Sequence, residues 1–316
     1  MTTLVYPPEW QKSWEWKGLR ISFIQTPDQP SRPSGQGATV LIHGFGACKE
    51  HWRHTVPALL EHQQVIAIDL VGFGATDKPA SRLKSETARQ GWRYGIDSWA
   101  EQVVALVKHL QLGPVQLVGN SIGGVVALAA AQQLEQQGDP VAQVVLIDCA
   151  QRNLDDKRLA EQPPLRRWGR PLLKSLVRQR WFTRVVFRSV VKRGVIRKVL
   201  LQAYPSGCNV DEQLIDILIT PAQQSGAEEA FHGFINLFDD RLAPEILETL
   251  HTPVALIWGE KDPWEPIAEA ERWLRFPCVK SLHRLPGLGH CPHDEDPGAV
   301  NDTLRTLLTQ VDQPTC

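Results

Sequence analysis

Short runs of apolar, mostly β-branched residues recur along the chain and alternate with stretches of helical periodicity. Such runs are typical of strands that are buried on both faces of a parallel sheet. Five are clear and a sixth is weaker: residues 39–43 (TVLIH), 65–69 (VIAID), 115–119 (VQLVG), 144–148 (VVLID), 254–258 (VALIW) and 280–285. The pattern predicts an α/β fold whose central sheet is mostly parallel, with helices on both faces.

Two stretches between these runs have the pattern of helices packed on a sheet. Residues 98–110 (SWAEQVVALVKHL) carry apolar positions at helical spacing, and Asp97 is a candidate N-cap. Residues 122–136 are small and apolar on most faces. Residues 14–25 alternate apolar and polar positions around Lys17-Gly18, which predicts an antiparallel hairpin at the sheet edge.

The pattern changes between about residues 151 and 243. This segment lacks clear strand runs and has helical periodicity with Pro and Gly breaks. We therefore predict a core domain of residues 1–150 and 244–316, with residues 151–243 inserted as a helical cap. A cap in this position covers the carboxyl ends of the strands, where ligands bind in open α/β sheets.

Composition narrows the class of protein. The 316 residues are 42% hydrophobic and 22% charged, with a net charge of −1, so the chain as a whole does not resemble a nucleic-acid binder. The N-terminus has no basic segment followed by an apolar run, and no stretch approaches a membrane span. Six scattered cysteines without a CxxC pair are typical of reduced thiols: Cys48, Cys149, Cys208, Cys278, Cys291 and Cys316. We expect a cytoplasmic protein with no metal or cofactor.

The candidate nucleophile is Ser121, in the sequence Gly119-Asn120-Ser121-Ile122-Gly123. This G-x-S-x-G motif lies directly after a predicted strand and before a predicted helix, the setting of a nucleophile elbow. A sharp turn there exposes the hydroxyl, and flanking glycines are needed because a Cβ would clash with the strand and the helix. The helix N-terminus also favours negative charge that develops beside the serine.

A serine hydroxyl needs a base, and the base needs an acid. His290 is the candidate base, in a Gly/Pro-rich loop after the last strand run, and His293 is its nearest competitor. Asp262 is the candidate acid, after the 254–258 run, with Asp148 as the alternative. The chain order serine, aspartate, histidine is the order expected when a nucleophile elbow comes first.

An oxyanion requires two backbone N–H donors where charge develops. Ile122 follows the nucleophile and supplies the first, and Phe45 in the loop His43-Gly44-Phe45-Gly46 supplies the second. We expect His43 to shape that loop by hydrogen bonds. Phe45, Trp264 and Asn120 are the predicted substrate contacts. Three cap residues could extend an apolar pocket, although core packing explains them better: Phe231, Phe234 and Phe238.

Five motifs stand in order along the chain: HGFG, DLVGFGATDKP, GNSIGG, WGEKDPW and GLGHCPH. Together they resemble the α/β-hydrolase superfamily across residues 20–310. The resemblance implies an α/β-hydrolase fold and a Ser-His-Asp triad. Serine at position 121 argues against the haloalkane dehalogenase and epoxide hydrolase branches, which place aspartate there.

Within the superfamily, LIHGFGACKEHWRH, AIDLVGFGATDKP, GNSIGG and WGEKDPWEP resemble hydrolases of cyanobacteria and plant plastids near pheophytinase and chlorophyll dephytylase. This implies cleavage of a hydrophobic carboxylic ester, such as a phytyl or other long-chain ester of a pigment or lipid. The GNSIGG motif also resembles carbon–carbon hydrolases of aromatic-ring degradation, which leaves diketone cleavage open. A non-catalytic ligand-binding protein on the same scaffold is the third hypothesis.

The cap contains a strongly basic segment at residues 152–198. It has fifteen Lys/Arg and only three acidic residues, a net charge of +12, so the rest of the chain carries −13. Aromatic and aliphatic residues are interleaved with these charges. Two interpretations stay open: a surface that contacts an anionic membrane from one side, or a lid whose basic side is merely solvated. Nucleic acid is not an expected partner.

Overall fold

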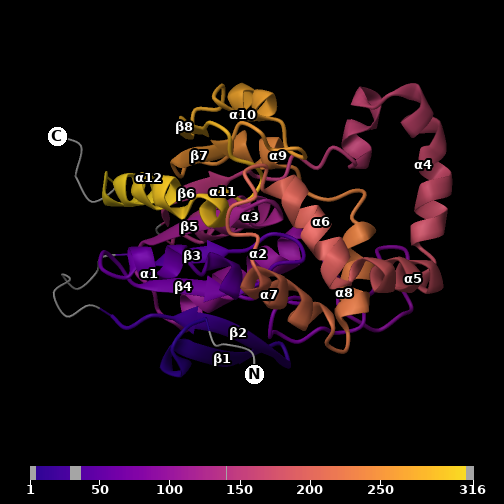
Figure 1. Ribbon diagram of the computed structural model, residues 1–316, viewed down its shortest axis with the longest axis horizontal. Helices are drawn as coiled ribbons and strands as arrows, with labels where there is room; N and C mark the ends of the chain where they lie inside the picture. Colours follow the sequence, from indigo (N-terminus) through magenta and orange to yellow (C-terminus); the bar gives the residue numbers. More distant parts are fainter. Residues whose placement is uncertain (1–4, 29–36, 140, 311–316) are drawn as a thin grey trace.

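The computed structural model describes residues 5–28, 37–139 and 141–310 (Figure 1). Eight strands form one sheet in the order β1-β2-β4-β3-β5-β6-β7-β8. The strands are β1 (Gln11–Trp16), β2 (Leu19–Gln25), β3 (Thr39–Ile42), β4 (Val65–Ile68), β5 (Val115–Asn120), β6 (Val141–Ile147), β7 (Val254–Gly259) and β8 (Val279–Leu285). Strands β3 to β8 pair in parallel, whereas β2 pairs antiparallel with both β1 and β4. The predicted parallel sheet and its edge hairpin are confirmed.

Helices cover both faces of the sheet. In the core they are α1 (Thr55–Leu59), α2 (Ile96–His109), α3 (Ile122–Gln136), α9 (Ala243–Leu247), α10 (Ile267–Trp273), α11 (Pro292–Glu295) and α12 (Pro297–Gln310), with short 3₁₀ turns η1 (Pro8–Trp10) and η2 (Lys49–Trp52). Between β6 and β7 lie η3 (Asp156–Glu161), α4 (Pro164–Val177), α5 (Arg180–Val190), α6 (Arg193–Ala203), α7 (Glu212–Ala222) and α8 (Ala227–Ile235). We keep the name cap for residues 151–243.

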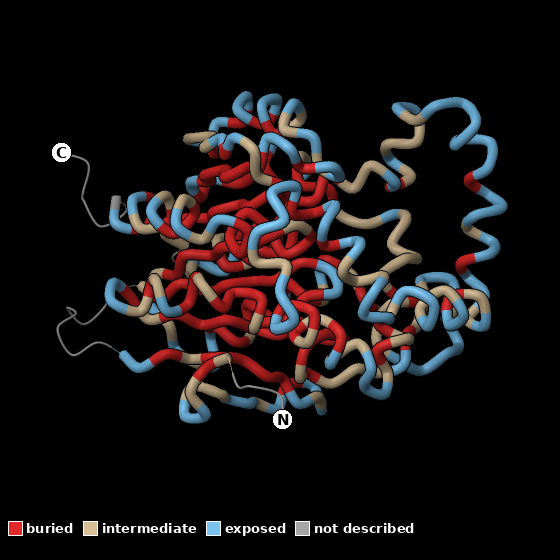
Figure 2. Tube along the Cα trace, in the orientation of Figure 1, coloured by how far each residue is buried: buried red, intermediate tan, exposed pale blue. Residues whose placement is uncertain are grey.

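The strands are continuous apolar runs in the sequence because each contributes side chains to two apolar cores, one on each face of the sheet. In β3, Val40 and Ile42 pack with α2, α3, α9 and α10 on one face. Leu41 points to the other face, where α1 and α12 cover the sheet. Successive side chains of a strand point to opposite faces, so a strand buried on both sides carries few polar residues. Figure 2 shows this buried sheet as the centre of the molecule.

The start of α2 differs from the sequence prediction. The helix begins at Ile96, so Asp97 lies inside its first turn and Gly95 is the N-cap. The carboxylate of Asp240, at the end of the cap, accepts the backbone N–H of Ile96 at 3.0 Å instead. A residue distant in sequence thus performs the capping that Asp97 was predicted to perform.

The cap has two parts that differ in how they meet the core. Helices α6, α7 and α8 lie against the body, whereas α4 stands away from it and returns through α5 (Figure 1). We call α4 and α5 together the outer arch. Most of the outer arch is exposed, in contrast to the buried sheet (Figure 2).

Candidate active site

Ser121 occupies the sharp turn between β5 and α3. Its backbone has φ 55° and ψ −125°, a strained conformation for a residue with a side chain. The close packing explains the flanking glycines. A Cβ on Gly119 would lie 2.2 Å from the carbonyl oxygen of Gly123, and a Cβ on Gly123 would lie 2.3 Å from that of Ile42. The sequence-predicted elbow is therefore formed as expected.

Asn120 was predicted to contact substrate, and the structure corrects this. The residue is 2% exposed, and its side-chain amide donates to the carbonyls of Ile147 at 3.1 Å and His290 at 3.0 Å. Both amide hydrogens are used inside the protein, so the side chain has no donor for a ligand. Asn120 instead ties the loop of the candidate base to the strand that carries Ser121.

The predicted base and acid lie together. Nδ1 of His290 is 2.7 Å from Oδ2 of Asp262, and both residues are buried. The other carboxylate oxygen of Asp262 accepts the backbone N–H groups of Trp264 and Glu265, at 2.8 and 3.1 Å. Because Asp262 is an acceptor, Nδ1 of His290 carries the proton and Nε2 is left to accept one. Trp264 packs edge-on against the imidazole, with ring centroids 4.8 Å apart.

Asp148, the alternative acid, does not bond His290. It is fully buried, and its Oδ1 accepts the N–H of Gly259 at 2.9 Å. Burial and then the neighbouring Asp262 raise the pKa of Asp148 well above its usual value. Burial likewise raises the pKa of Glu265 to about 8, and Asp262 contributes to that shift. Burial and the nearby Asp262 carboxylate thus favour the protonated forms of Asp148 and Glu265.

His293, the competing base, lies in an aromatic cluster. Its ring centroid is 4.4 Å from that of Trp52 and 4.7 Å from that of His51. Burial lowers the pKa of His293 well below its usual value. Within the described part of the chain, neither ring nitrogen has a hydrogen-bond partner. The structure therefore favours His290 over His293 as the base.

The loop after β3 is shaped by His43, as expected. Nδ1 of His43 donates to the carbonyl of Gly44 at 2.7 Å, and Nε2 accepts the N–H of Leu70 at 3.1 Å. The Gly44 carbonyl and the Phe45 N–H belong to one trans peptide group. Because they point in opposite directions, the Phe45 N–H points away from His43. A Cβ on Gly44 would lie 3.1 Å from the Cβ of Ser121, so this peptide passes close to the elbow. Ile122 is the first residue of α3, so its N–H has no acceptor within the helix.

A buried ion pair supports the same loop. The ammonium of Lys49 lies 2.8 Å from Oδ2 of Asp69 and 2.8 Å from Glu50. Asp69 also accepts the backbone N–H groups of Lys49 and Ala75. The Lys49 charge lowers the pKa of Asp69 despite its complete burial. The pair joins the loop after β3 to the loop after β4, where Asp69 stands.

Among the described residues, Cys48, Glu50 and Asp69 form the group whose spacing could hold a metal ion. The Lys49 ammonium contacts both carboxylates of that group and supplies the positive charge that balances them. We therefore infer that this group supports the loop after β3.

The aromatic residues predicted to line a pocket separate into two sets. Phe45 stacks on Phe234 with ring centroids 3.8 Å apart, and Phe231 lies 6.2 Å from Phe45. Phe45 and Phe231 line a small cavity of about 50 Å³. Phe238 instead packs beneath the guanidinium of Arg170, 4.4 Å away, and belongs to the cap. Phe231 and Phe234 are thus positioned beside the elbow loop, and Phe238 is not.

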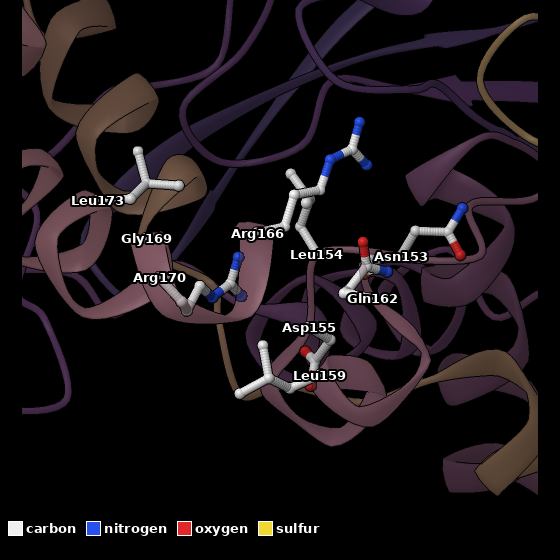
Figure 3. Close-up of a pocket in the computed structure, with 9 residues that line it drawn as sticks. All are labelled: Asn153, Leu154, Asp155, Leu159, Gln162, Arg166, Gly169, Arg170 and Leu173. Atoms are coloured by element: carbon white, nitrogen blue, oxygen red, sulfur yellow. Dashed lines mark hydrogen bonds between the residues drawn. The ribbon is translucent and has the colours of Figure 1, made fainter. Parts of the chain in front are cut away.

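A groove of about 290 Å³ lies between η3 and α4 (Figure 3). Leu154, Leu159 and Leu173 give it an apolar lining, and the side chains of Arg166 and Arg170 border it. None of the candidate catalytic residues lines this groove.

Several residues at the site were not found by sequence reasoning. The carbonyl of Ala203, at the end of α6, accepts the N–H of His290 at 2.8 Å. Lys49 and Glu265 were also missed, because no motif spacing relates them to their partners. For Asp69 there was a signal: a charged residue directly after a buried strand must find a partner.

Residues 39–303 match the alpha/beta hydrolase family. The chain is 27% identical to an uncharacterized hydrolase, YugF, of Bacillus subtilis (strain 168) over 274 residues, which cover 87% of this chain and 90% of YugF. It is 40% identical to a 2-hydroxy-6-oxo-2,4-heptadienoate hydrolase of Pseudomonas putida over 95 residues, 29% of this chain and 31% of that enzyme. The solved structure of the epoxide hydrolase CorEH superposes with a TM-score of 0.75 at 21% identity, covering 95% of this chain and 99% of CorEH.

The family match spans residues 39–303, most of the chain. The chain therefore belongs to the alpha/beta hydrolase family, and it is a hydrolase.

Proposed function

We propose that this protein hydrolyses hydrophobic carboxylic esters through an acyl-enzyme on Ser121. The observation that carries the proposal is the strained serine at the elbow, joined through Asn120 to a loop in which His290 is bonded to Asp262. Serine at this position suits acyl transfer, and it sets the chain apart from hydrolases that place aspartate there.

The mechanism follows from the protonation states. Nε2 of His290 takes the proton of Ser121 as the hydroxyl attacks the ester carbonyl, and Asp262 stabilises the imidazolium. The N–H groups of Ile122 and Phe45 hold the oxyanion. The alcohol leaves with the proton from His290, and water then attacks the acyl-enzyme with His290 again as base. Of the carboxyl groups of Asp148, Asp262 and Glu265, that of Asp262 is the one that is hydrogen-bonded to the imidazole.

The lining of the site favours an apolar acyl or alcohol group. Phe45 and Trp264 keep about two-fifths of their surface exposed, 39% and 40%, beside the elbow and the imidazole. The cavity at Phe45 is far smaller than a typical ligand site of roughly 300 Å³ or more. A long-chain ester, including the phytyl ester implied by the resemblance to pigment esterases, would therefore have to separate Phe45 from Phe234.

Carbon–carbon cleavage is the second candidate, because the 2-hydroxy-6-oxo-2,4-heptadienoate hydrolase is 40% identical over 95 residues. Its substrate class carries a carboxylate, which requires a free cation in the pocket. Lys78 lines the cavity at Phe45, but its ammonium is held by the carbonyls of Gly74 and Thr76 and by Gln224. Arg180, on the cap, is paired with Glu86 and Glu229. These contacts favour the ester.

The test is turnover of p-nitrophenyl esters of increasing chain length, with pheophytin, chlorophyll and a vinylogous diketone as further substrates. We expect Ser121→Ala to abolish ester turnover. Asp262→Asn should lower kcat by about 10³–10⁴-fold, because it destroys the tautomer that Nε2 needs. Asp148→Asn is the matched control, because Asp148 does not bond His290 and an amide oxygen can still accept the N–H of Gly259, and it should change kcat by less than about tenfold.

Three results would contradict the proposal. Turnover of the diketone but of no ester would assign carbon–carbon cleavage. Covalent labelling of Ser121 by a fluorophosphonate without multiple turnover on any substrate would indicate a ligand-binding protein. An equal loss of activity in Asp148→Asn and Asp262→Asn would contradict the assignment of the acid. Turnover of short esters alone would remove the pigment esters from the proposal and leave the mechanism intact.

A further inference from the structure

The apolar side of the outer arch faces solvent. On α4, Leu165 and Trp168 are each 81% exposed and Leu172 is 75% exposed. These residues recur at helical spacing, three and four positions apart, so they form one stripe along the helix. Leu176 follows four positions later on α4, and Trp181 and Val185 on α5 are exposed as well. We call these six residues the outer stripe.

Arg170 and Lys174 of α4 face inward, toward Asp156, whereas a surface helix usually turns such residues to solvent. Arg170 is buried, with its guanidinium over the ring of Phe238 and 3.4 Å from Asp156. Lys174 is bonded to the same aspartate. Because the charged side chains hold the helix to the cap, the apolar stripe is fixed in its outward position. Exposed apolar patches of this kind mark interaction sites.

The charge around the outer stripe is of one sign. Residues 162–210 contain twelve Lys/Arg and no Asp or Glu. Several of these cations are engaged by acidic residues of other segments, such as Arg184 by Glu228. Arg166, Arg167 and Arg178 are exposed and have no ion-pair partner within residues 5–28, 37–139 and 141–310. Free cations therefore flank the apolar stripe at both ends of α4.

We propose that the outer stripe inserts into the interface of an anionic lipid bilayer, with Arg166, Arg167 and Arg178 contacting lipid headgroups. An apolar helix face flanked by cations is the chemistry of interfacial helices, in which apolar burial and attraction to anionic lipid add. A second copy that met this face through a two-fold axis would place the same cations against one another. The described residues include no helix long and apolar enough to cross a bilayer.

The inner side of the outer arch leads to the candidate site. Phe187 on α5 lies 5.2 Å from Phe231 on α8, between ring centroids, and both line the cavity beside Phe45. A bilayer that holds the outer stripe would thus lie one helix away from the cavity. The binding itself does not depend on the proposed ester hydrolysis, and it can be measured in the absence of substrate.

The test is cosedimentation of the full chain with phosphatidylcholine vesicles, with and without an equal part of phosphatidylserine. We expect binding only to the anionic vesicles, and release at high salt because screening weakens the headgroup contacts. Trp168→Ser/Leu172→Ser should weaken partitioning at least about tenfold, since each removes one large apolar group from the bilayer. Arg166→Glu/Arg167→Glu should weaken it by a similar factor.

Matched controls use exposed residues outside the cap. Leu274→Ser removes a leucine that is 44% exposed, and Lys12→Glu/Lys280→Glu reverses two exposed charges. Both should bind like the wild type, as should Ser121→Ala, which separates binding from catalysis. Failure of the wild type to bind anionic vesicles would overturn the proposal, as would equal binding by Trp168→Ser/Leu172→Ser. Self-association in light scattering that this variant abolishes, without vesicle binding, would assign the outer stripe to a second copy.

Discussion

The two parts of the cap are held by opposite kinds of contact. The inner helices α6 and α7 are joined to the loop of the candidate base by buried, charge-assisted hydrogen bonds. Tyr204, after α6, donates to Asp294 at 3.2 Å, and Arg53 binds both Asp294 and the α7 N-cap residue Asp211. The outer arch instead leaves its apolar side uncovered. The inner helices thus help to hold the loop of the candidate base, whereas the outer arch is free to contact a surface outside the protein.

The contact of α6 with His290 shows what the inner part contributes. The N–H of His290 donates to Ala203, and Leu200, Ala203 and Tyr204 share an apolar cluster with Cys291. The position of the imidazole therefore depends on the cap as well as on β8. The outer arch has no comparable bond to the candidate base among the described residues.

The largest effect is expected where the inner part is anchored. Arg53→Met should lower the free energy of unfolding by about 3–5 kcal/mol, because it leaves Asp294 buried without its cation. Arg167→Met, in the outer arch, is the matched control and should stay within about 0.5 kcal/mol of the wild type. Urea denaturation of both variants measures the difference. Equal stability of the two variants would mean that the two parts are not anchored differently.

A smaller effect is expected from adding one methyl group where the base loop meets the inner part and another within the outer arch. A Cβ on Gly289 would lie 2.1 Å from the carbonyl of Ala203, so Gly289→Ala should cost about 1–3 kcal/mol and lower kcat by displacing His290. Gly169 in α4 has no atom within 4 Å of such a Cβ, and Gly169→Ala should stabilise the helix by up to about 1 kcal/mol. Thermal unfolding and ester turnover of the two variants test this. A stable, fully active Gly289→Ala would show that α6 does not position the base.

The smallest effect concerns Glu265, which holds the first residues of the cap. Its carboxylate accepts the N–H of Gln151 at 2.9 Å. The pKa of Glu265 is raised from an ordinary 4.5 to about 8, so the folded state binds a proton that the unfolded state has released. This stabilisation is complete below about pH 4.5 and is lost as the pH rises through about 8.

Glu265→Gln should therefore flatten the decline of stability between about pH 5 and pH 8, and be the more stable protein above pH 8 by a few degrees in Tm. Exposed Glu260→Gln serves as the control and should follow the wild type. Parallel Tm profiles for the wild type and Glu265→Gln across this range would contradict the assignment of the raised pKa.

The sequence by itself determined the sheet and the elbow, because both depend on local patterns. A strand buried on two faces is mostly apolar, as Val144 to Ile147 are, and a turn as tight as that at Ser121 admits only glycine at Gly119 and Gly123. Asp262 and His290 followed from their positions after β7 and β8, since neighbouring strands end at one edge of the sheet.

Only the tertiary structure decided which polar groups meet across distant segments. Asp240 caps α2 in place of Asp97, Asn120 bonds to the backbone instead of a ligand, and Ala203 holds His290. The sequence also did not determine that the outer stripe faces solvent. Helical periodicity defines an apolar face but not the direction in which that face points. Such contacts depend on the packing of whole elements, and no spacing along the chain encodes them.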